Sequence, residues 1–181
     1  LSEEYEVPVI VRMTTRVCHV KAMVEFDGER IERRAAGFQK NPQRWVMTPA
    51  NAKPRLSLMH ERDRKLREFS EISDLNVVFP GDDRRIGFVT SGPAFMHVRE
   101  TFPNAPVLKL GFSCPPPLEK IRALAGQVDT LVVVEETEPL LETEIRAAGL
   151  EVRGKDILPR WGELAPSVLR PATKPSLCEP Y

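Results

Sequence analysis

The strongest constraint on the fold is a regular alternation of apolar runs and helical segments between residues 84 and 160. Three runs, Arg85–Thr90, Val107–Leu110 and Thr130–Val134, have the length of strands, and an amphipathic stretch follows each of them. Strands joined through helices pair in parallel within one sheet. The last run is continuously apolar, which is typical of a strand covered on both faces. The pattern predicts an α/β fold with a doubly wound, mainly parallel sheet.

Local signals set the helix starts in this region. A Ser-Gly-Pro turn at 91–93 precedes the first helix, because proline is favoured at the first helical position. Three prolines at 115–117 open the second helix. The acidic run at 135–139 opens the third, where its charges suit the positive end of the helix dipole. Leu150–Val152 is predicted as a last short strand.

Residues 1–83 lack the material for a fold of their own. Val7–Met13 is predicted as a strand, Val20–Phe26 as a weaker extended piece and Arg55–Ile72 as a long helix. One good strand and one helix cannot bury their own apolar surface. We therefore predict four regions: the end of a neighbouring domain (1–51), a connecting helix and linker (52–83), the α/β domain (84–170) and a proline-rich tail (171–181).

Composition excludes several classes of protein. The 26 basic and 26 acidic side chains balance, which argues against a general nucleic-acid binder. No apolar run approaches the roughly 18 residues of a membrane span. Three distant cysteines form no disulfide framework and no metal-binding pair, which fits a reducing, cytoplasmic location. Residues 12–72 carry a net charge of +6, and residues 128–156 carry one of −5. These charges could form two solvated faces, or they could form a docking patch.

Ser91 and Gly92 form a candidate ligand loop. They follow the first predicted strand and precede a helix, and ligands in such folds bind at the carboxyl ends of the strands. Free backbone N–H groups at a helix start can hold an anion. The chain contains neither GxGxxG nor GxxxxGK(S/T), so a tight structural turn remains the alternative.

A second candidate cluster follows the predicted strand Val7–Met13. Thr14, Thr15, Arg16 and His19 lie where that strand is expected to end. An arginine fork and threonine hydroxyls suit a carboxylate or a phosphate. The alternative is a strand end covered by exposed polar groups.

The other reactive side chains form no site on sequence grounds. His60 and His97 have no metal-binding partner four residues away. Cys114 has no neighbouring base, so we interpret it as a small buried residue. No metal site and no complete catalytic constellation is predicted.

Six segments together resemble a known family. They are TTRVCH at 14–19, KNPQRWVMTPAN at 40–51, GFVTSGPAFMHVRE at 87–100, VLKLGFSCPPP at 107–117, LVVVEETEPLLETEIRAAG at 131–149 and GKDILPRWGELAP at 154–166. The chain resembles, from about Val7 to Arg170, the large, thiamine-pyrophosphate-binding subunit of indolepyruvate:ferredoxin oxidoreductase, a 2-oxoacid:ferredoxin oxidoreductase.

The resemblance implies a transketolase C-terminal-like domain preceded by the end of a pyrimidine-binding domain. It implies that the intact enzyme oxidatively decarboxylates aryl pyruvates to acyl-CoA, using thiamine pyrophosphate, Mg²⁺, iron–sulfur clusters and CoA. We expect this chain to be an internal fragment that binds none of these groups alone and has no catalytic residue. Its second domain would act as a scaffold. The residues that match the edge of the family's active site are Arg12, Thr14, Thr15, Arg16 and His19.

The resemblance also implies partners. They are the remaining domains of the same subunit, the small (beta) subunit, ferredoxin, the aryl pyruvate and CoA substrates, and a second copy in a homo-oligomer, with no nucleic acid and no membrane. Two alternatives stay open at this point. One is the transketolase-like domain of another thiamine-dependent 2-oxoacid dehydrogenase or of a transketolase. The other is a stand-alone binding or interaction module.

Overall fold

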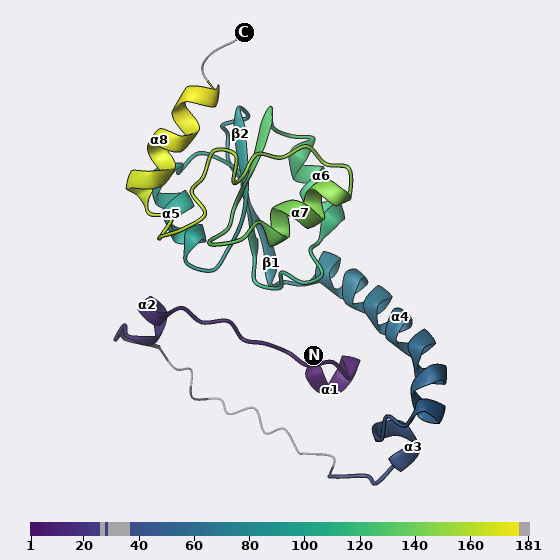
Figure 1. The fold of residues 1–181 in the computed structure, drawn as a ribbon. Helices are drawn as coiled ribbons and strands as arrows, with labels where there is room; N and C mark the ends of the chain where they lie inside the picture. Colours follow the sequence, from purple (N-terminus) through teal and green to yellow (C-terminus); the bar gives the residue numbers. More distant parts are fainter. Residues whose placement is uncertain (26–27, 29–36, 178–181) are drawn as a thin grey trace. The chain divides into compact units, whose positions relative to one another are not determined.

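The computed structural model describes residues 1–25, 28 and 37–177, with the backbone alone for 172–177. The chain divides into two compact units, Leu1–Arg62 and Asp63–Tyr181. The long helix α4 (Pro49–Ile72) contributes residues to both units (Figure 1). Each unit has its own architecture.

The second unit is built on a four-stranded sheet. Its strands are β1 (Asn76–Phe79), β2 (Ile86–Ser91), β3 (Val107–Leu110) and β4 (Thr130–Val134), in the spatial order β1-β3-β2-β4. β2 pairs in parallel with both β3 and β4, which confirms the mainly parallel sheet. β1 pairs antiparallel with β3. The structure thus takes a strand of the sheet from the segment that the sequence predicts as a linker.

Helices cover both faces of this sheet. On one face lie α5 (Ala94–Thr101) and α8 (Pro166–Leu177), which pack against a core that includes Phe88. On the other face lie α6 (Leu118–Ala125) and α7 (Leu140–Ala147), whose Ile121 and Ile145 are fully buried with Val133. The doubly wound α/β prediction is therefore confirmed (Figure 1).

Two details near the end of the sheet differ from the sequence prediction. Leu150–Val152 forms no strand, and a single parallel bridge joins Val132 to Arg153 instead. Helix α8 continues to Leu177 through residues that we predict as a proline-rich tail. Buried Leu169 anchors this helix to the core of its face, so tertiary packing outweighs the poor helix propensity of its prolines.

Among its described residues, the first unit contains helices joined by segments without regular secondary structure. The helices are α1 (Ser2–Tyr5), α2 (Thr15–Cys18), α3 (Pro42–Trp45) and the first part of α4. The predicted strand over Val7–Met13 is wrong, and residues 20–25 form no strand either; residue 26, the end of that second prediction, lies outside the described residues. A strand needs a neighbour for its backbone hydrogen bonds, and the described part of this unit supplies none. Apolar side chains such as Ile10 and Met23 are accordingly exposed.

Candidate functional site

The carboxyl ends of β2 and β4 form the point at which the sheet topology reverses. These two strands are parallel neighbours, yet α5, which follows β2, and α7, which follows β4, lie on opposite faces. Ligands of open α/β sheets bind outside the strands at such a switch point. The buried hydroxyl of Thr90 ties the two strands together there by donating to the carbonyl oxygen of Val134 at 2.9 Å.

The structure places the candidate loop of Ser91 and Gly92 at this switch point. Ser91 ends β2 and is half-buried, whereas Gly92 is exposed and has a φ of +60°, a value that favours glycine. The carbonyl oxygen of Gly92 accepts the N–H of Phe95 at 3.2 Å. The tight structural turn is thus present, and a ligand role for Ser91 and Gly92 stays a prediction.

Two helices on the same face of the sheet are each capped at their amino-terminal end by a glutamate side chain from outside the helix. The carboxylate of Glu135 accepts the N–H groups of Leu141 and Glu142, each at 2.9 Å, at the start of α7. The carboxylate of Glu71, from α4, accepts the N–H groups of Glu119 and Lys120 at 2.8 and 3.2 Å at the start of α6. These carboxylates satisfy N–H groups that a helix cannot pair internally. The chain therefore fills with its own anions two positions that could attract a ligand anion.

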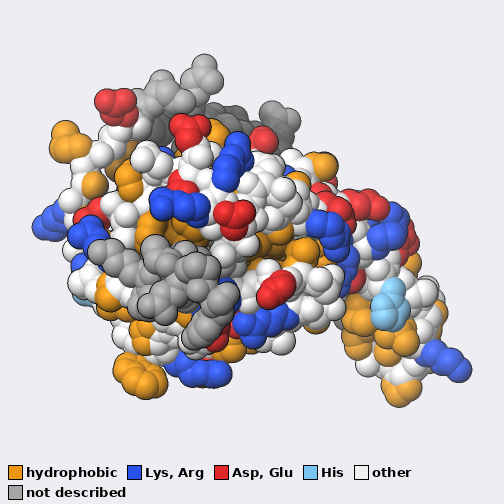
Figure 2. All heavy atoms as spheres, turned by 90° about the horizontal axis from the view of Figure 1, so that it is seen from above, with side chains coloured by type: hydrophobic (Ala, Val, Ile, Leu, Met, Phe, Trp, Pro, Cys, Tyr) orange, Lys and Arg blue, Asp and Glu red, His pale blue; other side chains and the backbone are white. Residues whose placement is uncertain are grey.

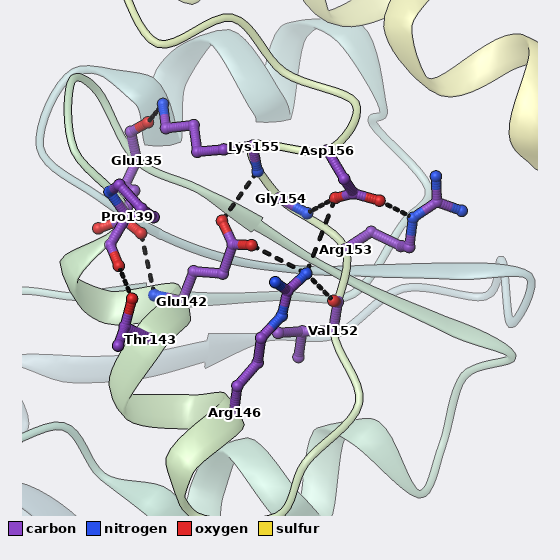
Figure 3. Close-up of polar contacts among 10 residues, drawn as sticks. All are labelled: Glu135, Pro139, Glu142, Thr143, Arg146, Val152, Arg153, Gly154, Lys155 and Asp156. Carbon is purple, nitrogen blue, oxygen red and sulfur yellow. Dashed lines mark hydrogen bonds and ion pairs between the residues drawn. The ribbon is translucent and has the colours of Figure 1, made fainter.

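A polar network extends from Glu135 to the segment that follows the Val132–Arg153 bridge (Figure 3). The ammonium of Lys155 donates to the carbonyl oxygens of Glu135 and Pro159, and its backbone N–H donates to the Glu142 carboxylate at 2.8 Å. Burial lowers the pKa of Lys155, and the nearby carboxylates of Glu135 and Glu142 oppose that shift. Glu142 is buried and forms an ion pair with Arg146 at 2.9 Å.

Asp156 completes this network. It accepts the N–H of Gly154 at 2.6 Å and a bond from the Arg153 side chain. Burial alone would raise the pKa of Asp156, but the bonds from Gly154 and Arg153 outweigh it and hold that pKa below its usual range. Each charge in the network is compensated by a partner within it. The arrangement fastens residues 153–160 to α7 and offers no carboxylate pair poised for acid–base chemistry.

The second candidate cluster takes a different form from the one predicted. Thr14 precedes the one-turn helix α2, and its hydroxyl oxygen accepts the N–H of Val17 at 3.5 Å. Arg12, Thr15, Arg16 and His19 are exposed. The structure therefore gathers Thr14–His19 on a single helical turn, and the prediction that they lie at the end of a strand is wrong.

Sequence reasoning missed a charged cluster in the first unit. The side chains of Arg44, Arg55 and Arg62 surround the carboxylate of Glu6, and the first of them also lies beside Trp45. Arg55 and Arg62 are seven residues apart on α4, so the spacing of two helical turns was the one local signal available.

The remaining reactive side chains are dispersed. His97 Nε2 lies 3.2 Å from Glu163 Oε1, and His60 is exposed. Cys114 is exposed as well, so the prediction that it is buried is wrong. Among the residues that the structure describes, no three His, Cys, Asp or Glu side chains are grouped to hold a metal ion.

No helix within the described ranges combines the length and the apolar character that crossing a membrane requires. On the face shown in Figure 2, basic and acidic side chains are interspersed with apolar ones.

The chain is similar to curated proteins named indolepyruvate oxidoreductase subunit IorA. The indolepyruvate oxidoreductase subunit IorA of Methanothermobacter thermautotrophicus is 36% identical over 95% of this chain, which spans 30% of that subunit. IorA of Archaeoglobus fulgidus is 32% identical over 86% of this chain, which spans 26% of that subunit. IorA of Pyrococcus horikoshii is 30% identical over 91% of this chain, which spans 28% of that subunit. The chain thus spans less than a third of these relatives. No protein-family model matches it.

A solved structure shares the fold. It is the 2-oxoglutarate:ferredoxin oxidoreductase from Magnetococcus marinus with 2-oxoglutarate, coenzyme A and succinyl-CoA bound, with a TM-score of 0.55 at 15% identity over 70% of this chain and 23% of that one. At this identity the likeness concerns the fold, which agrees with a transketolase C-terminal-like domain. Over most of its own length, the chain is similar to a segment of the IorA subunits of indolepyruvate oxidoreductase.

Proposed function

We propose that the chain works as part of the large subunit of a thiamine-pyrophosphate-dependent indolepyruvate:ferredoxin oxidoreductase, which converts aryl pyruvates to acyl-CoA. The observation that carries this proposal is the identity of 30–36% to IorA subunits over 86–95% of the chain. These similarities favour this proposal over the transketolase-like alternative from outside the ferredoxin-linked enzymes.

Within that enzyme, we assign residues 84–170 a positioning role. The charged side chains at the switch point are paired with one another or with helix ends, so they hold the loops in place. A rigid unit of this kind can place neighbouring cofactor domains and support a dimer. The first 51 residues would belong to the edge of the pyrimidine-binding domain, with residues 52–83 as the connection.

The cofactors would be held elsewhere in the intact enzyme. The described residues offer no grouped metal ligands, and the described cysteines, Cys18 and Cys114, are isolated thiols. The residues that the structure describes therefore do not fit Mg²⁺ or an iron–sulfur cluster. Thiamine pyrophosphate, Mg²⁺, the clusters and CoA would be bound by other domains and subunits. The partners would be the small subunit, ferredoxin and a second copy, and the assembly would be cytoplasmic.

The substrate edge of the active site would include Arg12, Thr14, Thr15, Arg16 and His19. Arg16 is the member with the strongest chemistry for a carboxylate, because a guanidinium can donate two parallel hydrogen bonds to it. Thr14 shapes the turn on which Arg16 is carried.

Turnover assays test the proposed function. The full-length large subunit with its small subunit is expected to reduce ferredoxin with indolepyruvate and CoA, and to do so faster than with 2-oxoglutarate. This 181-residue chain alone is expected to show no turnover and, by calorimetry, no binding of thiamine pyrophosphate with Mg²⁺. Turnover or stoichiometric cofactor binding by the chain alone would contradict the positioning role. Preference for a non-aromatic oxoacid would contradict the substrate class.

A further inference from the structure

Three arginines converge on one carboxylate in the first unit. Arg44 and Arg62 each pair with Glu6, and Arg55 Nη2 lies 3.9 Å from Glu6 Oε2. Arg55 also donates to the carbonyl oxygen of Arg44, which joins α3 to α4. The three side chains thus form one cluster, here called the arginine cluster, around the carboxylate of Glu6.

The arginine cluster carries more positive charge than its carboxylate neutralises. Three guanidinium groups against one carboxylate leave a net charge of +2. The side chains of Glu6 and Arg55 are only 16% and 17% exposed, so solvent screens this excess poorly, whereas Arg44 is 50% exposed and opens the cluster to solution. A doubly charged phosphate group balances such a cluster better than a single carboxylate does, and guanidinium forks match its oxygens.

Glu6 has the properties of a displaceable occupant. It follows the one-turn helix α1 with φ 52° and ψ 46°, a left-handed conformation that a non-glycine residue adopts uncommonly. Releasing Glu6 would let its backbone return to an ordinary conformation, which offsets part of the cost of breaking its ion pairs.

Trp45 lies at the border of the arginine cluster. The guanidinium carbons of Arg44 and Arg55 are 5.1 and 6.0 Å from the centre of its ring, and 54% of the residue is exposed. An aromatic face beside a phosphate-binding group can stack on a planar base. It also provides a fluorescent reporter within the cluster.

We propose that Arg44, Arg55 and Arg62 form a binding site for a phosphate-bearing ligand, whose anionic group takes the place of the Glu6 carboxylate. The site does not depend on the oxidoreductase assignment, and it can be tested without turnover. The phosphate could belong to a free polyphosphate or to a nucleotide, and the two differ in whether a base reaches Trp45.

The test uses the fluorescence of Trp45. The chain has two tryptophans, Trp45 and Trp161, and Trp161 is 80% exposed, so Trp161→Phe leaves one reporter at small structural cost. This variant is titrated with inorganic pyrophosphate, with ADP and with adenosine. Pyrophosphate and ADP are expected to change the fluorescence saturably, and adenosine is not. Tighter binding of ADP than of pyrophosphate would identify a nucleotide, and equal affinities a free polyphosphate.

Substitutions separate a binding site from a merely structural ion cluster. Glu6→Gln is expected to tighten binding about tenfold because it removes the competing anion, and an unfolded variant cannot produce that gain. Arg62→Gln is expected to weaken binding at least about tenfold. The matched control is Arg64→Gln on the same helix, where Arg64 pairs with Glu68 outside the cluster; it is expected to change affinity less than about twofold.

Three results would overturn the proposal. One is the absence of saturable binding in both the Trp161→Phe chain and its Glu6→Gln derivative. Another is unchanged or weaker binding after Glu6→Gln. The last is an equal loss of affinity in Arg62→Gln and Arg64→Gln, because this would indicate general attraction to a basic surface.

Discussion

The carboxylate of Glu142 fills the space beside Gly154. A Cβ atom at position 154 would lie far inside van der Waals contact with Oε2 of Glu142, and that oxygen also accepts the neighbouring Lys155 N–H. Glu142 is buried, so it has little freedom to move aside. Residue 154 is therefore limited to glycine by a side chain from α7.

Gly154→Ala is expected to destabilise the second unit by about 1–3 kcal/mol, the usual cost of forcing extra atoms into a packed site. Urea unfolding followed by circular dichroism measures this. The control is Gly126→Ala, where the nearest atom to a new Cβ would be 3.7 Å away and φ is −69°. It is expected to be neutral or slightly stabilising. Equal effects of the two substitutions would contradict the steric argument.

Glu135→Ala is expected to lower the free energy of unfolding by about 0.5–2 kcal/mol, as the loss of a helix-capping side chain does. The cause is that the N–H groups of Leu141 and Glu142 lose their acceptor. Chemical denaturation measures this effect, and Glu144→Ala, at an exposed glutamate on α7, is the control for the lost negative charge. The interpretation fails if both variants are equally stable.

Asp156 should make stability depend on pH in the acidic range. Its folded-state pKa lies below that of the unfolded chain, so its contribution is fully present above the ordinary aspartate pKa of about 4. That contribution is lost as the pH falls through the folded-state pKa. The difference in unfolding free energy between the unsubstituted chain and Asp156→Asn is therefore expected to be largest near neutral pH and to shrink on acidification. A difference that stays constant with pH would exclude this origin.

Arg16→Ala in the intact two-subunit enzyme is expected to raise the KM for indolepyruvate about tenfold or more, because a charge-assisted bond to the substrate carboxylate is lost. Steady-state kinetics with Lys21→Ala as the control measure it; Lys21 is an exposed cation nearby that we do not place at the substrate edge. Unchanged KM and kcat would remove Arg16 from the site.

Most of the sheet could be predicted because its information is local. The runs that become β2, β3 and β4 are mostly apolar, and each helix between them has its own amphipathic spacing. β1 was harder to predict, because Val77 and Val78 are largely exposed and only Phe79 packs towards the core. Its place depends on pairing with β3, which lies far along the chain.

The first unit shows the opposite case. Val7–Met13 has the composition of a strand, yet β propensity reflects packing against neighbours more than a backbone preference. Without a pairing partner among the described residues, the segment forms no strand. The composition of Val7–Met13 predicted a strand, but the lack of a neighbouring strand among the described residues left it without one.

The candidate sites divide in the same way. Ser91 and Gly92 could be placed at the strand end from the turn signal alone. The network of Glu135, Glu142 and Lys155 could not be found, because its members meet through the fold over separations of up to 20 residues. The pairing of Arg62 with Glu6 spans 56 residues and has no local signature.

The carboxylate of Glu71, which accepts N–H groups at the start of α6, has a consequence for the order in which the fold assembles. Because α6 receives the acceptor for its first N–H groups from the last turn of α4, its amino-terminal end is completed only when that turn has docked. Helices α4 and α6, which are separated in the chain by three strands and a helix, thus gain stability together. A truncation or junction placed within the final turn of α4 would fray a helix that begins more than forty residues away.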